Sequence, residues 1–196
     1  MINKKWISNS LVYNGILVAV FFFLAFSTSG KGLVIEGLMK IGFFQPTLEL
    51  PSSVIKHGNP VADILFQNSR GADIHLHQLR GKVVFINFWA TWCPPCIAEM
   101  PSIDKLHSSL QDNKHIVFIM VDVDNDLKKS TRFMSSHKLN LDVYMAMTEI
   151  PGNMLGGSIP TTIILDKTGH IVFSHAGGAD YSNAAVLPYL ENLALH

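Results

Sequence analysis

The sequence has 196 residues and a formal net charge of zero, with 15 lysines and arginines against 15 aspartates and glutamates. A chain of this length holds one ordinary domain and a short additional segment. The balanced charge excludes the basic footprint of a nucleic-acid-binding protein and the long charged tails of interaction segments.

The first predicted element is an apolar segment at the N-terminus, between Lys5 and Lys31. A helix from Trp6 to Ser27 would be about 33 Å long, enough to cross a bilayer core of about 30 Å. Basic residues precede it, as on the cytoplasmic side of membrane anchors. We therefore interpret residues 1–30 as an anchor that places the rest of the chain outside the cytoplasm. A cleaved signal segment is the open alternative, because small residues follow the apolar run at cleavage-like spacing.

Residues 31–56 are interpreted as a linker in which glycines and prolines recur, and a globular domain is predicted over residues 57–196. Within it, the apolar run 83–89 predicts a strand covered on both faces. The other predicted elements are strands at 62–66, 74–76, 116–123 and 143–146, a hairpin of 160–166 with 171–175, and helices at 94–110, 127–138 and 184–195. This order implies a mixed β-sheet with helices on both faces.

The chain contains two cysteines, Cys93 and Cys96, separated by two residues. A bridge between them would close too small a loop to support a fold, which favours reversible redox chemistry. Cys93 would open the predicted helix, where unpaired N–H groups and the helix dipole stabilise a thiolate. Pro94 and Pro95 suit the first helical turn, which does not need their missing N–H groups. Cys96, one turn later and more buried, would resolve a mixed disulfide formed by Cys93.

The cysteines and histidines do not match the usual motifs of zinc or haem sites. The chain has no second cysteine pair for a zinc site, and haem attachment would need a histidine where Ile97 stands. His75 and His77 alternate along a predicted strand face and could bind a metal, but solvated strand histidines are the commoner case. We therefore predict no metal site, and no cofactor besides the redox-active disulfide.

Three sequence segments carry a family resemblance. FWATWCPPC, residues 88–96, resembles the active-site segment of the thioredoxin superfamily. LRGKVVFIN before it and IAEMP after it resemble the membrane-anchored TlpA/ResA-like branch. SIPT, residues 158–161, resembles the loop whose proline is cis and lies against the disulfide. The resemblance covers residues 57–196 and implies a thioredoxin-like α/β fold, with a central mixed β-sheet flanked by helices.

The resemblance also implies how the resolving cysteine exchanges its proton. Thioredoxin itself carries a buried aspartate where this chain has Asn87, and an asparagine cannot titrate. In the TlpA/ResA-like branch, a glutamate three residues beyond the second cysteine takes part in this chemistry, and Glu99 matches it. We therefore count Glu99 with Cys93 and Cys96 as catalytic, the alternative being a solvated helix glutamate.

The predicted substrate-binding residues surround the cysteines. Trp92 is expected on the exposed surface, whereas Trp89 is expected to complete the core. The resemblance implies a cis bond before Pro160, with Ile159 shielding the sulfurs. The substrate-binding set is completed by the residues between the cysteines, Pro94 and Pro95.

The function that the resemblance implies is an extracytoplasmic thiol–disulfide oxidoreductase that reduces protein disulfides. A role in cytochrome c maturation is one function that this resemblance includes. Its expected partners are exported protein disulfides, a membrane thiol reductant that donates electrons, and the membrane itself through the N-terminal helix. Nucleic acid is not an expected partner. The expected location is a single-pass membrane protein with its domain on the periplasmic side.

Other functions of the same fold remain open. A periplasmic disulfide oxidase or isomerase would use the same cysteine pair. A peroxidase normally has threonine or serine where Ala90 stands, and its resolving cysteine is usually placed elsewhere. A copper metallochaperone spaces its cysteines by three residues and adds a histidine, for which His170 or His175 would have to serve.

Overall fold

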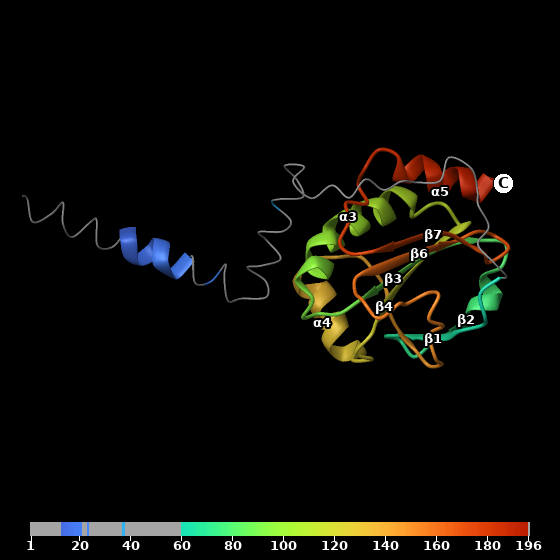
Figure 1. Cartoon of the computed structure of the whole chain (residues 1–196), viewed down its shortest axis with the longest axis horizontal. Helices are drawn as coiled ribbons and strands as arrows, with labels where there is room; N and C mark the ends of the chain where they lie inside the picture. The colour runs from blue at the N-terminus through green and yellow to red at the C-terminus, as the bar shows by residue number, and fades with distance from the viewer. Residues whose placement is uncertain (1–12, 21–22, 24–36, 38–59, 196) are drawn as a thin grey trace, which may run out of the picture.

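A computed structural model describes residues 13–20, 23, 37 and 60–195 of the chain (Figure 1). The predicted anchor and linker lie largely outside these residues, and so does the predicted start of the domain at His57. Residues 13–20 are helical. Among the residues described, no helix combines the length and the apolar character that a bilayer crossing needs.

The described strands form one seven-stranded sheet in the order β2-β1-β5-β4-β3-β6-β7. Along the chain, the elements are β1 (Leu65–Asn68), β2 (Asp73–His75), the 3₁₀ helix η1 (Leu76–Leu79), β3 (Val83–Trp89), α3 (Pro94–Leu110), β4 (Ile116–Asp122), α4 (Leu127–Ser136), β5 (Val143–Ala146), β6 (Thr161–Leu165), β7 (Ile171–Ala176) and α5 (Val186–Leu195). The sheet is mixed, because β3, β4 and β5 are parallel while β1–β2, β1–β5, β3–β6 and β6–β7 are antiparallel pairs. The predicted mixed sheet is confirmed.

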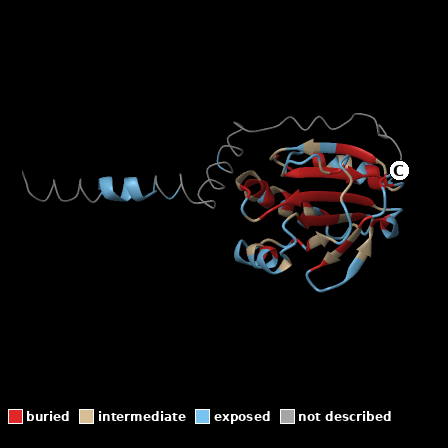
Figure 2. Ribbon diagram, turned by 60° about the horizontal axis from the view of Figure 1, so that its bottom comes forward, coloured by how far each residue is buried: buried red, intermediate tan, exposed pale blue. Residues whose placement is uncertain are grey.

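Strand β3 lies at the centre of the hydrophobic core. All seven of its residues are buried, and β4 and β6 pair with its two edges (Figure 2). Because successive side chains of a strand point to opposite faces, Phe85 joins the core on one face and Ile86 joins the core on the other. The continuous apolar run therefore reflects a strand without a solvent-facing side, as its sequence predicted.

The prediction that the helices at 94–110, 127–138 and 184–195 cover both faces is wrong, because all three pack on one face and the other carries only a short 3₁₀ helix. Buried side chains of α3, α4 and α5 all join the core cluster that contains Phe85. The other face is covered by η1 and by the segments around Ile64 and Met154. The physical reason is the direction of the crossovers. Strands β3, β4 and β5 follow one another the same way across the sheet, so right-handed crossovers place α3 and α4 on the same side.

Local hydrogen bonds set the element ends that the sequence pattern missed. The first strand begins at Leu65 rather than at residue 62, and the turn after it is closed by the Asn68 side chain, which accepts hydrogen bonds from two backbone N–H groups. The second strand ends at His75, whose backbone N–H donates to the Gln78 side chain as η1 begins. The last helix starts at Val186 rather than at residue 184. The bounds 83–89, 94–110 and 143–146 are confirmed to the residue.

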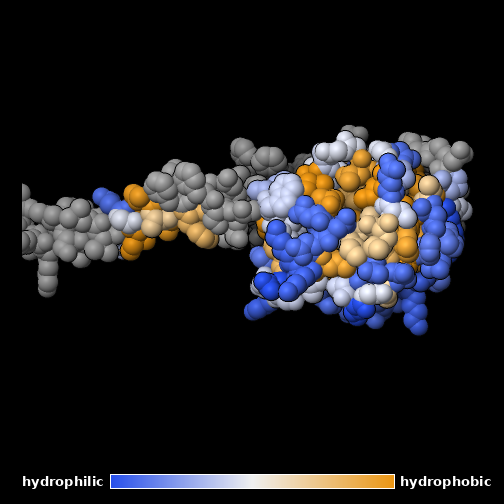
Figure 3. Space-filling view, turned by 90° about the horizontal axis from the view of Figure 1, so that it is seen from below, coloured by the Kyte–Doolittle hydropathy of each residue, from blue (hydrophilic) through white to orange (hydrophobic). Residues whose placement is uncertain are grey.

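The surface of the domain is mixed in character. On the face seen in Figure 3, hydrophobic residues gather in the middle and hydrophilic residues lie on both sides. Among the described residues of the domain, Trp92 and Met147 are large hydrophobic side chains that stay about half exposed, at 54% and 48%.

A buried carboxylate organises the connection from β4 to α4. Asp122 is 1% exposed and accepts hydrogen bonds from the backbone N–H groups of Asp124 and Asp126 and from the hydroxyl of Ser130. Asp126 in turn caps α4 by accepting a bond from the N–H of Lys129. The connection therefore depends on one buried carboxylate and one exposed cap.

These two carboxylates should differ in their effect on stability. Replacing Asp122 leaves several donors without a partner in a buried place, so Asp122→Ala should lower the free energy of unfolding by about 2–4 kcal/mol. Asp126→Ala removes only a helix cap and should cost about 1 kcal/mol. Urea unfolding of the two variants measures both values. Equal losses would contradict the central role of Asp122.

Candidate active site

The candidate site lies where β3 ends and α3 begins. Cys93 is the N-cap residue of α3, and Pro94 and Pro95 occupy the first two helical positions, as their missing N–H groups allow. Cys96 follows in the first turn, and its backbone N–H donates to the Cys93 sulfur at 3.3 Å. The predicted placement of both cysteines, after a buried strand and at a helix start, is confirmed.

The two sulfurs form a disulfide, with the Cα atoms 5.3 Å apart. Cys96 is fully buried, and Cys93 is only 3% exposed. Cys96 is the more buried of the two, as expected, but the margin is small in this oxidised form. Little of Cys93 is therefore exposed to a partner in this form.

The loop before β6 closes over the disulfide from the other side. The bond between Ile159 and Pro160 is cis, as the resemblance implied. The carbonyl oxygen of Ile159 lies 3.9 Å from the Cys93 sulfur, and the Ile159 side chain is partly buried against the core. Pro160 is buried, and its carbonyl accepts a hydrogen bond from the N–H of Gly177. Ile159 is thus placed to shield the sulfurs, while Pro160 lies beneath the surface.

The residues predicted to contact substrate differ in exposure. Trp92 is exposed, and its indole N–H donates to the carboxylate of Asp124 at 2.7 Å, which fixes the ring beside the cysteines. Pro94 and Pro95 are partly exposed. Trp89 is fully buried, so its expected core role is confirmed. An exposed aromatic ring beside the disulfide gives an incoming chain an apolar contact.

A second buried cluster lies behind the disulfide. Glu99 stands three residues after Cys96, on the same face of α3, and is fully buried. One carboxylate oxygen accepts a hydrogen bond from the Asn87 side chain at 2.8 Å, and the other accepts one from the backbone N–H of Ala179 at 3.1 Å. The alternative of a solvated helix glutamate is therefore wrong.

The position of Asn87 explains this contact. The residue lies in β3, and its side chain points to the same face as Phe85, which is the face that α3 covers. Its amide also donates to the hydroxyl of Thr162 on the neighbouring strand β6, at 2.9 Å. An uncharged amide here donates to the carboxyl group, where a second carboxylate would repel it.

Burial dominates the titration of this cluster. It raises the pKa of Glu99 from 4.5 to about 8, although the hydrogen bonds from Asn87 and Ala179 lower the value in part. Burial also raises the pKa of Tyr181 well above its ordinary value, with the nearby charge of Glu99 adding to the effect. At neutral pH, Glu99 is therefore mainly in its protonated acid form, with a minor fraction as carboxylate.

The sequence pattern does not indicate that some of these residues contact the Glu99 cluster. Thr162 and the backbone of Ala179 contact the network only because β6 and the segment after β7 pass close to α3. Gly178 lies beside Pro95, where an added Cβ would be at an ordinary contact distance of 3.4 Å. These contacts are long-range, so neither periodicity nor spacing indicates them. The glycine pair next to the last strand hints only at the turn there, since Gly177 has a positive φ of 109°.

Comparison with known proteins agrees with this geometry. A family model described as Redoxin matches residues 56–187. The chain belongs to the redoxin family. It is 31% identical over 127 residues to the thiol-disulfide oxidoreductase ResA of Halalkalibacterium halodurans, covering 64% of this chain and 72% of that protein. It is 32% identical over 124 residues to the thioredoxin-like protein YneN of Bacillus subtilis, covering 63% of this chain and 73% of that one.

A solved structure supports the same assignment. A protein from Bacteroides vulgatus described as a thiol-disulfide oxidoreductase is 30% identical to this redoxin-family chain, with a TM-score of 0.59. The match covers 72% of this chain and 99% of that structure. The predicted resemblance to the TlpA/ResA-like branch and the predicted enzyme class, thiol–disulfide oxidoreductase, are both confirmed.

The raised pKa of Glu99 predicts a pH-dependent stability. Between pH 4.5 and about 8, the folded chain holds a proton that the unfolded chain has released, so this group lowers the free energy of unfolding as pH rises. The difference between the two values corresponds to at most about 5 kcal/mol. Glu99→Gln, which cannot ionise, should lose this component in urea unfolding of the oxidised chain measured across that range.

Glu149→Gln is the matched control, because Glu149 is exposed. Its unfolding free energy should follow that of the wild type at every pH. An unchanged pH dependence in Glu99→Gln would mean that the buried carboxyl group does not hold its proton in the folded chain.

Proposed function

We propose that this chain reduces disulfide bonds of exported proteins through Cys93 and Cys96. The observation that carries the proposal is the asymmetry of the pair. The Cys93 sulfur receives the N–H of Cys96 at the start of α3, whereas Cys96 is fully enclosed beside a carboxyl group. One sulfur is thus stabilised as a thiolate, and the other is screened from substrates.

The proposed reaction starts from the dithiol form. The Cys93 thiolate attacks one sulfur of a substrate disulfide, forming a mixed disulfide and releasing the other substrate sulfur as a thiolate. The Cys96 thiolate then attacks the Cys93 sulfur and releases the second substrate sulfur. Two electrons pass to the substrate, and the chain is left with its Cys93–Cys96 disulfide. No cofactor takes part in this exchange.

Glu99 is proposed to handle the proton of Cys96. Cys96 must lose its proton before it can attack, and an acceptor in a dry site needs a pKa near the working pH. The buried carboxyl group one turn further along α3 has a pKa of about 8. In its carboxylate form it can take the proton of Cys96, with Asn87 and Ala179 holding it in place.

The surface around Cys93 is proposed to hold the substrate chain. Trp92, Pro94 and Pro95 offer apolar contacts on one side of the disulfide. On the other side, the partly exposed Ile159 is the substrate contact of the loop, and Pro160 beneath it shapes the loop through its cis bond. An extended peptide lying between them would bring its own disulfide to Cys93.

The proposed location follows from the sequence. A membrane anchor at residues 1–30 would hold the domain on the extracytoplasmic side of the cell membrane, where protein disulfides form. A membrane thiol reductant would then return the Cys93–Cys96 disulfide to the dithiol. Apocytochrome c is one candidate among the exported substrates.

Trapping tests the exchange directly. In Cys96→Ser, a mixed disulfide on Cys93 cannot be resolved, so the full chain expressed in cells should retain exported proteins in complexes that a thiol reductant releases. Non-reducing gels and mass spectrometry identify the partners. The double variant Cys93→Ser with Cys96→Ser is the matched control and should retain none. If a folded, expressed Cys96→Ser chain traps no proteins, the proposed disulfide exchange is contradicted.

The reduction potential tests the direction of electron flow. A reductase should have a midpoint nearer that of thioredoxin, about −270 mV, than that of strong periplasmic oxidants, about −120 mV, because about 30 mV changes a two-electron exchange tenfold. Equilibration of the chain with glutathione buffers gives the value. A midpoint close to that of the strong oxidants would reverse the proposed direction and favour an oxidase.

A further inference from the structure

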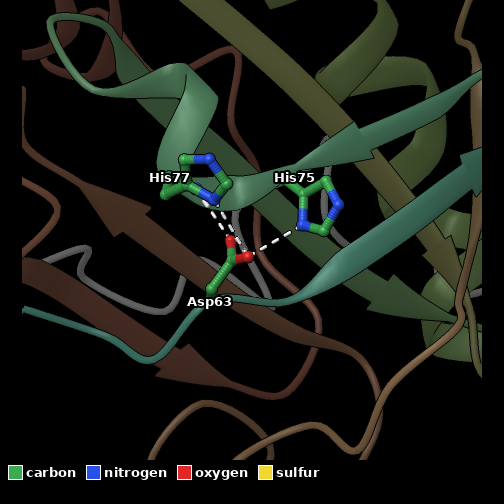
Figure 4. A group of neighbouring side chains, drawn as sticks. All are labelled: Asp63, His75 and His77. Carbon is green, nitrogen blue, oxygen red and sulfur yellow. Dashed lines mark hydrogen bonds and ion pairs between the residues drawn. The ribbon is translucent and has the colours of Figure 1, made fainter.

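Three side chains meet at the edge of the sheet furthest from β7. Asp63 precedes β1, His75 ends β2, and His77 lies in η1 (Figure 4). The sequence pattern placed both histidines on one strand face, which is wrong for His77. The turn into η1 instead carries both imidazoles toward the chain segment that leads into β1, where the carboxylate of Asp63 lies between them (Figure 4).

The carboxylate of Asp63 is fixed in orientation. One oxygen accepts a hydrogen bond from the backbone N–H of His77 at 2.9 Å. The other oxygen lies 2.8 Å from Nδ1 of His75 and 2.9 Å from Nδ1 of His77. Two ring nitrogens and one carboxylate oxygen therefore converge on one point, and the backbone contact holds the carboxylate in the position that both rings face.

The donor types suit a cation. Asp63 offers a carboxylate oxygen and each histidine offers a ring nitrogen, which are ligands that divalent transition metals take in proteins. Each Nδ1 lies at hydrogen-bond distance from the carboxylate, so a bound metal would replace these contacts and release any proton that they share.

The spacing also suits a transition metal. The three ligand atoms lie within 4.8 Å of one another. Tetrahedral zinc with ligands at about 2.0–2.1 Å needs them roughly 3.3 Å apart, which small rotations of exposed imidazoles supply. The side chains of Asp63, His75 and His77 are 39%, 42% and 58% exposed, so an ion can enter and water can complete its coordination.

We propose that Asp63, His75 and His77 bind a divalent transition-metal ion such as Zn²⁺. Two imidazoles and a carboxylate form a donor set that such ions take in proteins, with open positions left for water. The prediction of no metal site did not consider Asp63, which lies twelve residues before His75 and joins it only in the folded chain.

The metal site is separate from the disulfide. It joins β2 and η1 to the segment before β1, while Cys93 follows β3, and β1, β5 and β4 lie between β2 and β3 in the sheet. An ion there would tie the edge of the sheet to the residues that enter the domain. Since it would bind the folded chain and not the unfolded one, it would stabilise the domain without entering the thiol exchange.

Zinc titration of the oxidised full chain tests the site, because the disulfide removes both thiols as competing ligands. After treatment with a chelator, the chain should bind one equivalent of Zn²⁺ in isothermal titration calorimetry, and its melting temperature should rise with added Zn²⁺. Asp63→Asn, His75→Asn and His77→Asn should each weaken binding at least about tenfold and reduce the rise in melting temperature. Melting curves without metal show whether each variant is folded.

His115→Asn is the matched control, since His115 is an exposed histidine outside the cluster. This variant should bind Zn²⁺ as the wild type does. Binding that is equally strong in the wild type and in all three cluster variants would place the ion elsewhere and overturn the proposal. A dissociation constant of the wild type weaker than about 100 μM would also overturn it, and neither result would affect the thiol-exchange proposal.

Discussion

The structure depends on the burial of β3 on both faces. Because every residue of this strand is enclosed, the chain that leaves its end enters α3 inside the domain rather than at an open edge. The disulfide forms at that junction, and the helix that follows lies on the face where Asn87 points. The redox pair, its carboxyl neighbour and the amide that holds this carboxyl group are therefore all consequences of one covered strand.

Burial acts differently on the two sides of the disulfide. Cys93 caps the helix, and its sulfur accepts an N–H, which stabilises a negative charge even with little solvent. Glu99 receives two hydrogen bonds, but these do not compensate for the loss of water, so its proton is held more tightly. The nucleophile proposed here and the acid held in its neutral form thus lie six residues apart at the start of the same helix, with Cys96 between them. This arrangement is the basis of the proposed proton transfer between Cys96 and Glu99.

The domain carries its remaining chemistry at the opposite part of the sheet. Asp63, His75 and His77 gather where β2 turns into η1, and three strands separate β2 from β3 in the sheet. The backbone N–H of His77 and the two imidazoles orient the carboxylate. The proposed metal site, which would stabilise the start of the domain, is thus separate from the thiol-exchange site. A substitution at one site can therefore leave the other unaffected.

The sequence by itself determined the elements whose signals are local. The unbroken apolar run of β3 and the prolines after Cys93 indicate a buried strand followed by a helix start, because both depend on neighbouring residues. Only the tertiary structure decided the face on which the helices pack, the burial of Glu99, and the meeting of Asp63 with two histidines. Each of these depends on strand order and on contacts between distant residues, as when Ala179 reaches Glu99 eighty residues away. Local pattern carries no information about such contacts, since sheet order and crossover direction bring those residues together.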